Sequence, residues 1–288
     1  MEIAAVNALL CPHCGLSFNN PAPGDNALVC ADGHSFDIAR QGYLNLLTGH
    51  GTKFVPDTAA MVEARDAFLD AGHYQGLGDA LAEKVAAHLA TNGSVPALIV
   101  DAGTGTGWYL QQVLAATASG SSAAVGLDIS KFALRRAARR NPLAVNIVWD
   151  LWRDLPLGAD TADVVLVIFA PRNASEFARI LKPGGRLVVV TPLPQHLAEI
   201  AKEAGMLGIQ EDKETALVQS MAADFELVDS QELLVPMELS PADVGNVALM
   251  GPAGHHMDAI ELSHRLAHLP EKTRATAAFR ISVFTPRV

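Results

Sequence analysis

The chain has 288 residues, half of them hydrophobic, which fits a globular protein built as one large domain or as one domain with a small appendage. The formal net charge of −10 argues against a protein whose whole surface binds nucleic acid. No apolar run approaches the roughly 20 residues that span a bilayer, and the segment 1–6 carries an acid where a signal peptide would be basic. We therefore predict a cytoplasmic protein that does not bind membranes.

Three cysteines and a histidine near the start of the chain have the spacing of a zinc site. Cys11 and Cys14 form a C-x2-C pair, and Cys30 and His34 form a C-x3-H pair. Two such pairs on tight turns can close a tetrahedron around Zn²⁺. Four protein ligands leave no open position for water, so we predict one structural zinc ion.

Two further histidines, His13 and His50, compete with His34 for the fourth position. His13 lies inside the C-x2-C pair, where its ring would have difficulty folding back onto the metal, so His34 is the better ligand. Residues 1–48 are therefore predicted to form a small zinc-binding module. Residues 49–96 are predicted to form a linker followed by two helices, the first capped by Asp57-Thr58.

The stretch 97–110 predicts a strand, a glycine-rich turn and the start of a helix. Asp101 ends the apolar run and is expected to order the turn. A dinucleotide would require G-x-G-x-x-G, but Trp108 stands where the third glycine would fall. The observed G-x-G-x-G after an acid is the form that S-adenosylmethionine enzymes use, and a glycine-rich loop without a ligand is the alternative. Three residues of the turn are expected to hold the amino-acid part of this cofactor: Gly103, Gly105 and Thr106.

From residue 97 onward, apolar strands alternate with helices. Further strands are expected at 123–128, 145–148, 163–169 and 186–191. This alternation predicts an α/β fold over residues 97–288, with a mostly parallel, Rossmann-like sheet and ligands at the carboxyl ends of its strands. Segments 225–235 and 277–284 are also strand-like and could pair antiparallel at an edge of the sheet.

Acids after two of these strands are candidate cofactor ligands. Asp128 ends the second strand and is expected to accept both ribose hydroxyls of the cofactor. The alternative for Asp128 is an N-cap of the next helix. Asp150 follows the third strand and could reach the adenine amine. No residue is identified as a catalytic base.

Several short motifs accompany the zinc pattern, and together they are shared with a known family. They are G-Y-L-N at 42–45, G-H-Y at 72–74, G-L-D-I-S-K at 126–131, K-P-G-G at 182–185, and T-P at 191–192 followed by H-L at 196–197. With them, the chain resembles the 23S ribosomal RNA (guanine-N1) methyltransferase family over about residues 10–200. Pieces such as F-A-P-R-N at 169–173 look most like the branch that includes tylosin-type macrolide-resistance enzymes.

The resemblance implies a class I S-adenosylmethionine-dependent methyltransferase with an N-terminal zinc-binding module. Its substrate would be N1 of a guanine in a 23S rRNA hairpin near the peptide exit tunnel, next to the macrolide site, with macrolide resistance as a further implication. It also implies a homodimer, and it places Tyr74 and His196 in the cofactor pocket. Read without the family, Tyr74 is a packing residue at a helix end and His196 is a first-turn histidine.

Two features bear on an RNA substrate. Residues 131–186 carry ten basic residues against five acids, which would allow a local basic face, although charge runs are more often solvated helix surfaces. Trp108, Trp149 and Trp152 are candidate stacking platforms, with core packing as the alternative. Two other functions stay open: a methyltransferase of a small molecule, and a non-catalytic, zinc-stabilised RNA-binding protein that senses S-adenosylmethionine.

Overall fold

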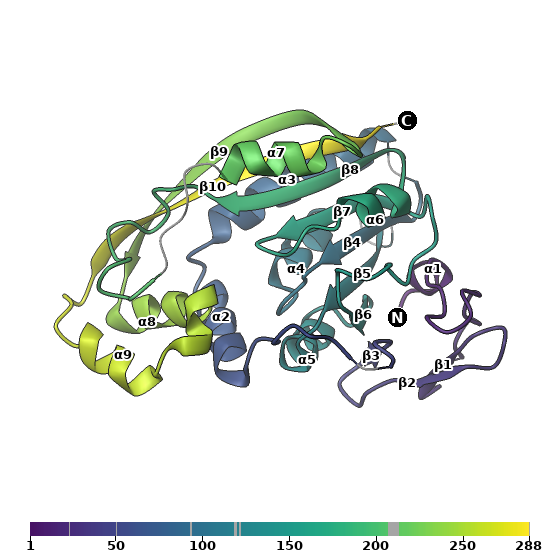
Figure 1. Ribbon diagram of the computed structural model, residues 1–288, viewed down its shortest axis with the longest axis horizontal. Helices are drawn as coiled ribbons and strands as arrows, with labels where there is room; N and C mark the ends of the chain where they lie inside the picture. The colour runs from purple at the N-terminus through teal and green to yellow at the C-terminus, as the bar shows by residue number, and fades with distance from the viewer. Residues whose placement is uncertain are drawn as a thin grey trace.

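The computed structural model describes residues 1–22, 24–49, 51–92, 94–117, 120, 122–206 and 213–287. Its centre is a sheet with the strand order β3-β6-β5-β4-β7-β8-β10-β9 (Figure 1). These strands are β3 (Tyr43–Asn45), β4 (Ala97–Ala102), β5 (Ser122–Asp128), β6 (Val145–Val148), β7 (Ala162–Ile168), β8 (Leu181–Pro192), β9 (Phe225–Leu239) and β10 (Thr273–Pro286). The first six strands pair parallel with one another, whereas β10 is antiparallel to both β8 and β9.

The central strands are apolar because helices cover both faces of the sheet. Every residue of β4 and of β7 is buried, as expected for parallel strands that contact water on neither face. The predicted parallel sheet is thereby confirmed. The predicted antiparallel pairing of the two late segments is also confirmed, with Ala277 opposite Val235.

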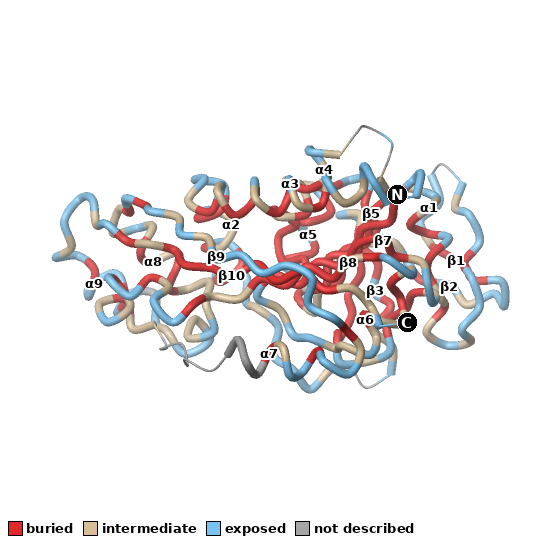
Figure 2. The backbone as a smooth tube through the Cα atoms, turned by 90° about the horizontal axis from the view of Figure 1, so that it is seen from above, coloured by how far each residue is buried: buried red, intermediate tan, exposed pale blue. Residues whose placement is uncertain are grey.

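Helices fill the connections between the strands. They are α1 (Ile3–Asn7), α2 (Ala59–Asp70), α3 (Gln75–Asn92), α4 (Trp108–Ala116), α5 (Lys131–Arg140), α6 (Ala174–Ile180), α7 (Lys213–Met221), α8 (Pro241–Leu249) and α9 (Ala259–Leu266), with a 3₁₀ turn η1 (Pro252–His256). Figure 2 shows the buried strands as a band with α3 and α4 on one side and α6 and α7 on the other. Leu81 of α3 and Phe177 of α6 therefore belong to two separate apolar cores.

The first helix of the linker region begins as the sequence predicts. The Thr58 hydroxyl accepts a hydrogen bond from the Met61 N–H at 3.2 Å, which satisfies a donor that the first turn leaves unpaired. The helix ends before Gly72, whose φ of +81° suits a residue without a Cβ. Gly72 turns the chain so that α2 and α3 are joined by a short connection containing Tyr74.

The N-terminal segment forms a hairpin of β1 (Ala27–Val29) and β2 (Ser35–Asp37) and docks against residues 156–158, which precede β7. The Leu10 N–H donates to the Pro156 carbonyl at 3.0 Å, and Gly158 donates to Ala8 at 2.9 Å. β3 lies within the predicted 1–48 module but pairs with β6 in the large sheet. The boundary at residue 48 stays a prediction, and the zinc hairpin itself ends before β3.

Within the described part of the chain, no helix combines the length and apolar character required to cross a membrane.

Candidate functional site

The four predicted zinc ligands converge at one point. Their ligand atoms all lie within 4.8 Å of one another, with the Cys14 and Cys30 sulfurs 3.7 Å apart and the Cys30 sulfur 3.5 Å from Nδ1 of His34. Tetrahedral zinc with Zn–S bonds of about 2.3 Å holds two sulfurs about 3.8 Å apart. The spacing therefore fits one zinc ion held by Cys11, Cys14, Cys30 and His34.

The turns that carry these ligands explain how they converge. The Gly15 N–H donates to the Cys11 carbonyl, and the Gly33 N–H donates to the Cys30 carbonyl at 2.9 Å, so each ligand pair closes on its own tight turn. His13 packs its ring on the ring of His34, with centroids 5.0 Å apart, and is not part of the cluster. The other rival ligand, His50, lies outside the described residues.

The glycine turn is held between β4 and β5. The N–H groups of Gly103 and Thr104 donate to the Leu127 carbonyl at 2.8 and 2.9 Å, and the Gly105 N–H donates to Oδ2 of Asp128 at 2.9 Å. Gly103 has a φ of +91°, and a Cβ there would collide with the Cβ of Ala170. The turn therefore needs glycine at position 103 both for its backbone conformation and for its contact with Ala170.

Two observations show that this turn can hold a ligand. A Cβ at Gly105 would meet only Arg65, at 3.8 Å from its Cδ and Nη1, so the backbone there is not closely packed. The Thr106 hydroxyl is buried and has no hydrogen-bond partner among the described residues. Buried polar atoms are normally paired, so an unpartnered hydroxyl at this loosely packed turn fits a polar ligand there.

Asp128 and Asp101 put two carboxyl groups beside the turn. Oδ1 of Asp128 accepts from the Ser130 N–H at 2.8 Å, while Ser130 itself is the N-cap of α5, so Asp128 is not the cap. Burial raises the pKa of Asp128, and the Ser130 and Gly105 N–H groups oppose that rise. Burial likewise raises the pKa of Asp101 to about 7, with Thr104 lowering it and Asp128 raising it. Both acids therefore lie where sequence reasoning placed them, and their cofactor contacts stay predictions.

Tyr74 and His196 are far apart in sequence but meet in the structure. The Tyr74 hydroxyl lies 3.2 Å from Nε2 of His196, and Nδ1 of His196 lies 3.1 Å from both the N and the O of Ala278. Burial raises the pKa of Tyr74, which keeps the phenol protonated. The structure thus brings together two residues that the resemblance places in the cofactor pocket, and their role in binding a cofactor stays a prediction.

Burial lowers the pKa of His196 to about 4, partly offset by Ala278 and Glu199. The pKa of a histidine in an unfolded chain is about 6.5, so on acidification the unfolded state binds the proton first. His196 thus contributes stability above about pH 6.5 that is lost between pH 6.5 and about 4, amounting to roughly 3 kcal/mol. Urea unfolding at pH 7.5 and 4.5 should show a smaller loss for His196→Gln than for the wild type. An equal loss in both proteins would contradict this.

Phe279 extends this contact into an aromatic cluster that the sequence did not indicate. Its ring centroid lies 4.9 Å from those of Tyr74 and His196 and 5.6 Å from that of Phe169. Phe169 follows β7, is 46% exposed and has a φ of +55°, which is unusual for a residue with a Cβ. No sequence signal marks Phe279, because an aromatic residue in an apolar strand is indistinguishable from ordinary core.

Asp150 lies after β6, next to the strand that ends in Asp128. Its Oδ2 accepts from the Thr52 hydroxyl at 2.7 Å and its Oδ1 accepts from the Trp152 N–H at 3.1 Å. Asp150 therefore anchors the loop that follows β3, a contact that sequence reasoning missed. A role for Asp150 toward adenine stays a prediction.

The three tryptophans separate into two groups. Trp108 and Trp149 are 4% and 5% exposed and belong to the core, so the stacking interpretation is wrong for them. Trp152 is 53% exposed and faces the ring of Phe54, with centroids 6.4 Å apart. Trp152 and Phe54 together form an exposed aromatic pair beside Asp150.

The basic residues between 131 and 186 do not form one continuous face. Arg136 and Arg140 bind Asp66 of α2 at 2.5 and 2.7 Å, so α5 is fastened to α2. Lys182 binds Asp163 at 2.7 Å. These three cations are paired with acids and join elements of the fold, so they do not add to a basic face. A basic face on the other residues of this run stays a prediction.

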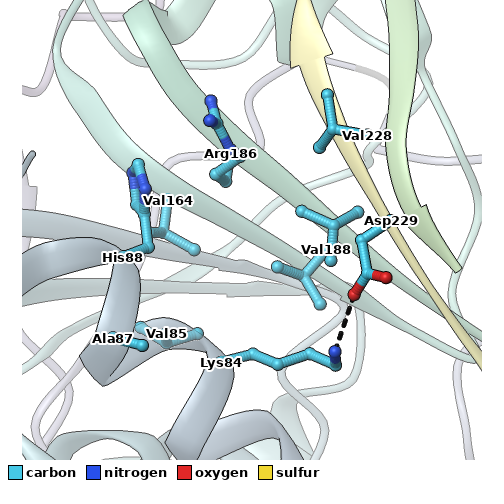
Figure 3. A pocket seen from close by; sticks show the side chains of 10 residues that line it. Lys84, Val85, Ala87, His88, Val164, Arg186, Val188, Val228 and Asp229 are labelled. Atoms are coloured by element: carbon cyan, nitrogen blue, oxygen red, sulfur yellow. Dashed lines mark hydrogen bonds and ion pairs between the residues drawn. The ribbon is translucent and has the colours of Figure 1, made fainter. Parts of the chain in front are cut away.

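A separate pocket of about 270 Å³ lies between α3 and the strands β7 to β10. Figure 3 shows Lys84 pointing toward Asp229, with Nζ 2.7 Å from the carboxylate, while His88 and Arg186 lie farther along the wall. Val164, which lines the pocket, is near the amino end of β7. Ligands of open α/β sheets bind at the carboxyl ends of strands, so this pocket is separate from the glycine turn.

Family models match the two regions of the chain that contain the zinc ligands and the glycine turn. A family model described as "RlmA, N-terminal" matches residues 9–50, and one described as "Methyltransferase domain" matches residues 99–185. The chain is 42% identical over 99% of both chains to a 23S rRNA (guanine(748)-N(1))-methyltransferase of Streptomyces fradiae. It is 41% identical, over 96% of this chain and 97% of the other, to a putative 23S rRNA (guanine-N(1)-)-methyltransferase of Micromonospora griseorubida.

Among solved structures, a complex of the Haloferax volcanii Trm112 methyltransferase activator with a putative methyltransferase aligns with a TM-score of 0.52. It is 17% identical and covers 82% of this chain and all of that one. This likeness concerns the fold alone.

Proposed function

Because the chain belongs to the 23S rRNA (guanine-N1)-methyltransferase family, we propose that it transfers a methyl group from S-adenosylmethionine to N1 of a guanine in 23S rRNA. The observation that carries the proposal is a match that extends over both the zinc hairpin and the sheet, at 42% identity over 99% of the chain. The proposed target is the guanine named for the Streptomyces fradiae relative, guanine 748.

S-adenosylmethionine supplies an electrophilic methyl group when bound. The turn from Gly103 to Thr106 is suited to its amino-acid part because it combines a glycine backbone, which a ligand can approach closely, with the unpartnered Thr106 hydroxyl. Asp128 is suited to its ribose, since a carboxylate fixed by two N–H groups is already oriented and retains lone pairs for hydroxyl donors. The cofactor would then lie at the carboxyl ends of β4 and β5, beside the exposed Phe169.

Guanine N1 carries a proton in the neutral base and is a poor nucleophile until that proton leaves. The acceptor base must therefore be unpaired, held by its Watson–Crick edge and aligned with the methyl–sulfur bond. Exposed aromatic rings beside the strand ends provide surfaces on which RNA bases can stack. Phe54 and Trp152 are 38% and 53% exposed and lie in the loops that Asp150 joins.

The direct test uses a synthetic hairpin of the 23S rRNA target region with labelled S-adenosylmethionine and mass mapping of the product. Methylation at N1 of one guanine supports the proposal. Binding of RNA and cofactor without turnover would contradict it and favour a non-catalytic sensor. Methylation of small molecules but not of the hairpin would favour the small-molecule enzyme.

Trp152→Ala should weaken RNA recognition rather than cofactor binding. Stacking of one base is worth about 1–3 kcal/mol, so we expect roughly a 10-fold rise in KM for the hairpin with little change in kcat. Affinity for S-adenosylhomocysteine should stay unchanged. Trp152→Phe, which keeps a ring, is the matched control. A fall in kcat alone for Trp152→Ala, with KM unchanged, would show that the ring does not bind RNA.

The family resemblance also supports proposals on the oligomeric state, the cellular location, the domain boundaries and a role in resistance. We propose a homodimer that acts in the cytoplasm, with residues 1–48 as a zinc-binding module, 49–96 as linker and helices, and 97–288 as the catalytic domain. Sedimentation of the purified chain tests the dimer.

A role in macrolide resistance is tested by expressing the chain in a susceptible host, where the inhibitory concentration of tylosin should rise.

A further inference from the structure

One guanidinium lies over the glycine turn. Arg65 belongs to α2, and a Cβ placed on Gly105 would lie 3.8 Å from both Cδ and Nη1 of Arg65. In the sequence, Ala64-Arg65 belongs to the motifs shared with the family, and no role was assigned to Arg65. Here three quarters of its side chain is covered, with 25% exposed.

Contacts from distant segments fix Arg65 in this position. Its Nη1 binds the carboxylate of Asp57, and its Nη2 donates to the Met250 carbonyl at 2.8 Å. The Asp57 carbonyl in turn accepts from the Ser130 hydroxyl at 2.9 Å, next to the N–H that binds Asp128. A guanidinium has five N–H donors, and these two contacts use two of them.

The carboxyl groups around the glycine turn leave Arg65 as the cation that can bind an anionic part of a ligand there. Asp101, Asp128 and Asp57 place three carboxyl groups near the turn, and the field of Arg65 acts to lower the pKa of Asp128 against the effect of burial. The methionine part of S-adenosylmethionine carries its own carboxylate, which these acids would repel. Arginine matches a carboxylate in geometry as well as in charge.

We propose that Arg65 binds the α-carboxylate of the methionine moiety of S-adenosylmethionine while remaining bound to Asp57 and Met250. This inference rests on the proposed function, because it assigns a residue to the cofactor of that reaction. It makes Arg65 a cofactor ligand that α2 contributes from outside the sheet.

The test compares two ligands by calorimetry: S-adenosylhomocysteine, which has the carboxylate, and 5′-methylthioadenosine, which lacks the amino-acid part. Arg65→Met should weaken binding of the first about 30-fold or more and change binding of the second less than 2-fold, and Arg65→Lys should fall between. Arg136→Met is the matched control, since Arg136 also holds α2, through Asp66, but does not lie at the turn.

Equal weakening of both ligands in Arg65→Met would mean that the residue only supports the fold and would overturn the inference. Unchanged binding of S-adenosylhomocysteine would overturn it as well. If the wild-type protein bound neither ligand, the proposed function would fail together with the inference. If the wild-type protein binds both ligands, failure of the Arg65 inference can be distinguished from failure of the proposed function.

Discussion

Replacement of Asp128 by Asn should weaken binding of S-adenosylmethionine about 100-fold or more. The carboxylate accepts N–H bonds from Gly105 and Ser130, and an amide cannot accept both while also accepting from ribose hydroxyls. Hydrogen bonds to a charged group contribute about 1.5–3 kcal/mol each, which sets the scale of the loss. Calorimetry with S-adenosylhomocysteine measures it.

The loss of affinity for each of the two ligands distinguishes the role of Asp128 from that of Arg65. 5′-Methylthioadenosine keeps the ribose, so Asp128→Asn should weaken its binding as strongly as that of S-adenosylhomocysteine. Asp154→Asn removes the same charge from an exposed position and should leave both affinities unchanged. Retention of wild-type affinity in Asp128→Asn would refute the ribose assignment.

Replacement of Cys11 and Cys14 by Ser should release the zinc ion and unfold the hairpin around β1 and β2. Zinc-finger peptides gain about 10–16 kcal/mol of apparent free energy from the metal, far more than the small apolar contacts of this hairpin can supply. Metal analysis should fall from one equivalent to none, and hydrogen exchange over residues 11–38 should become fast.

The large sheet should survive this change. β3 pairs with β6, so the chain after the hairpin remains anchored, and binding of S-adenosylhomocysteine should stay within a few fold of the wild type. Hairpin RNA methylation should fall if the zinc hairpin contacts the RNA. His13→Ala is the matched control, because the His13 ring contacts the His34 ring without joining the ligand cluster. Retention of one equivalent of zinc by the double variant would refute the ligand set.

Local sequence was sufficient for the parts of both sites whose residues are close in the chain. The C-x2-C and C-x3-H pairs each lie on one tight turn, and the glycine turn lies between a strand and the helix it starts, so spacing alone brings the groups together. The parallel sheet followed from the alternation of apolar runs with helices, whereas the order of its strands came only from the structure. Asp128 was found for the same reason, since it ends the strand next to the turn.

Contacts between distant segments could not be predicted in this way. Tyr74 and His196 meet because α2, α3 and the loop after β8 pack on the same face of the sheet, and the side chain of Arg65 reaches the glycine turn from α2. The pairing of Arg136, Arg140 and Lys182 could not be predicted for the same reason, since their partners Asp66 and Asp163 lie on other elements. The sequence by itself thus determined the zinc ligands, the glycine turn and the sheet, whose patterns are local. Only the tertiary structure decided which charges are paired and which side chains surround the turn, because helix packing sets those contacts.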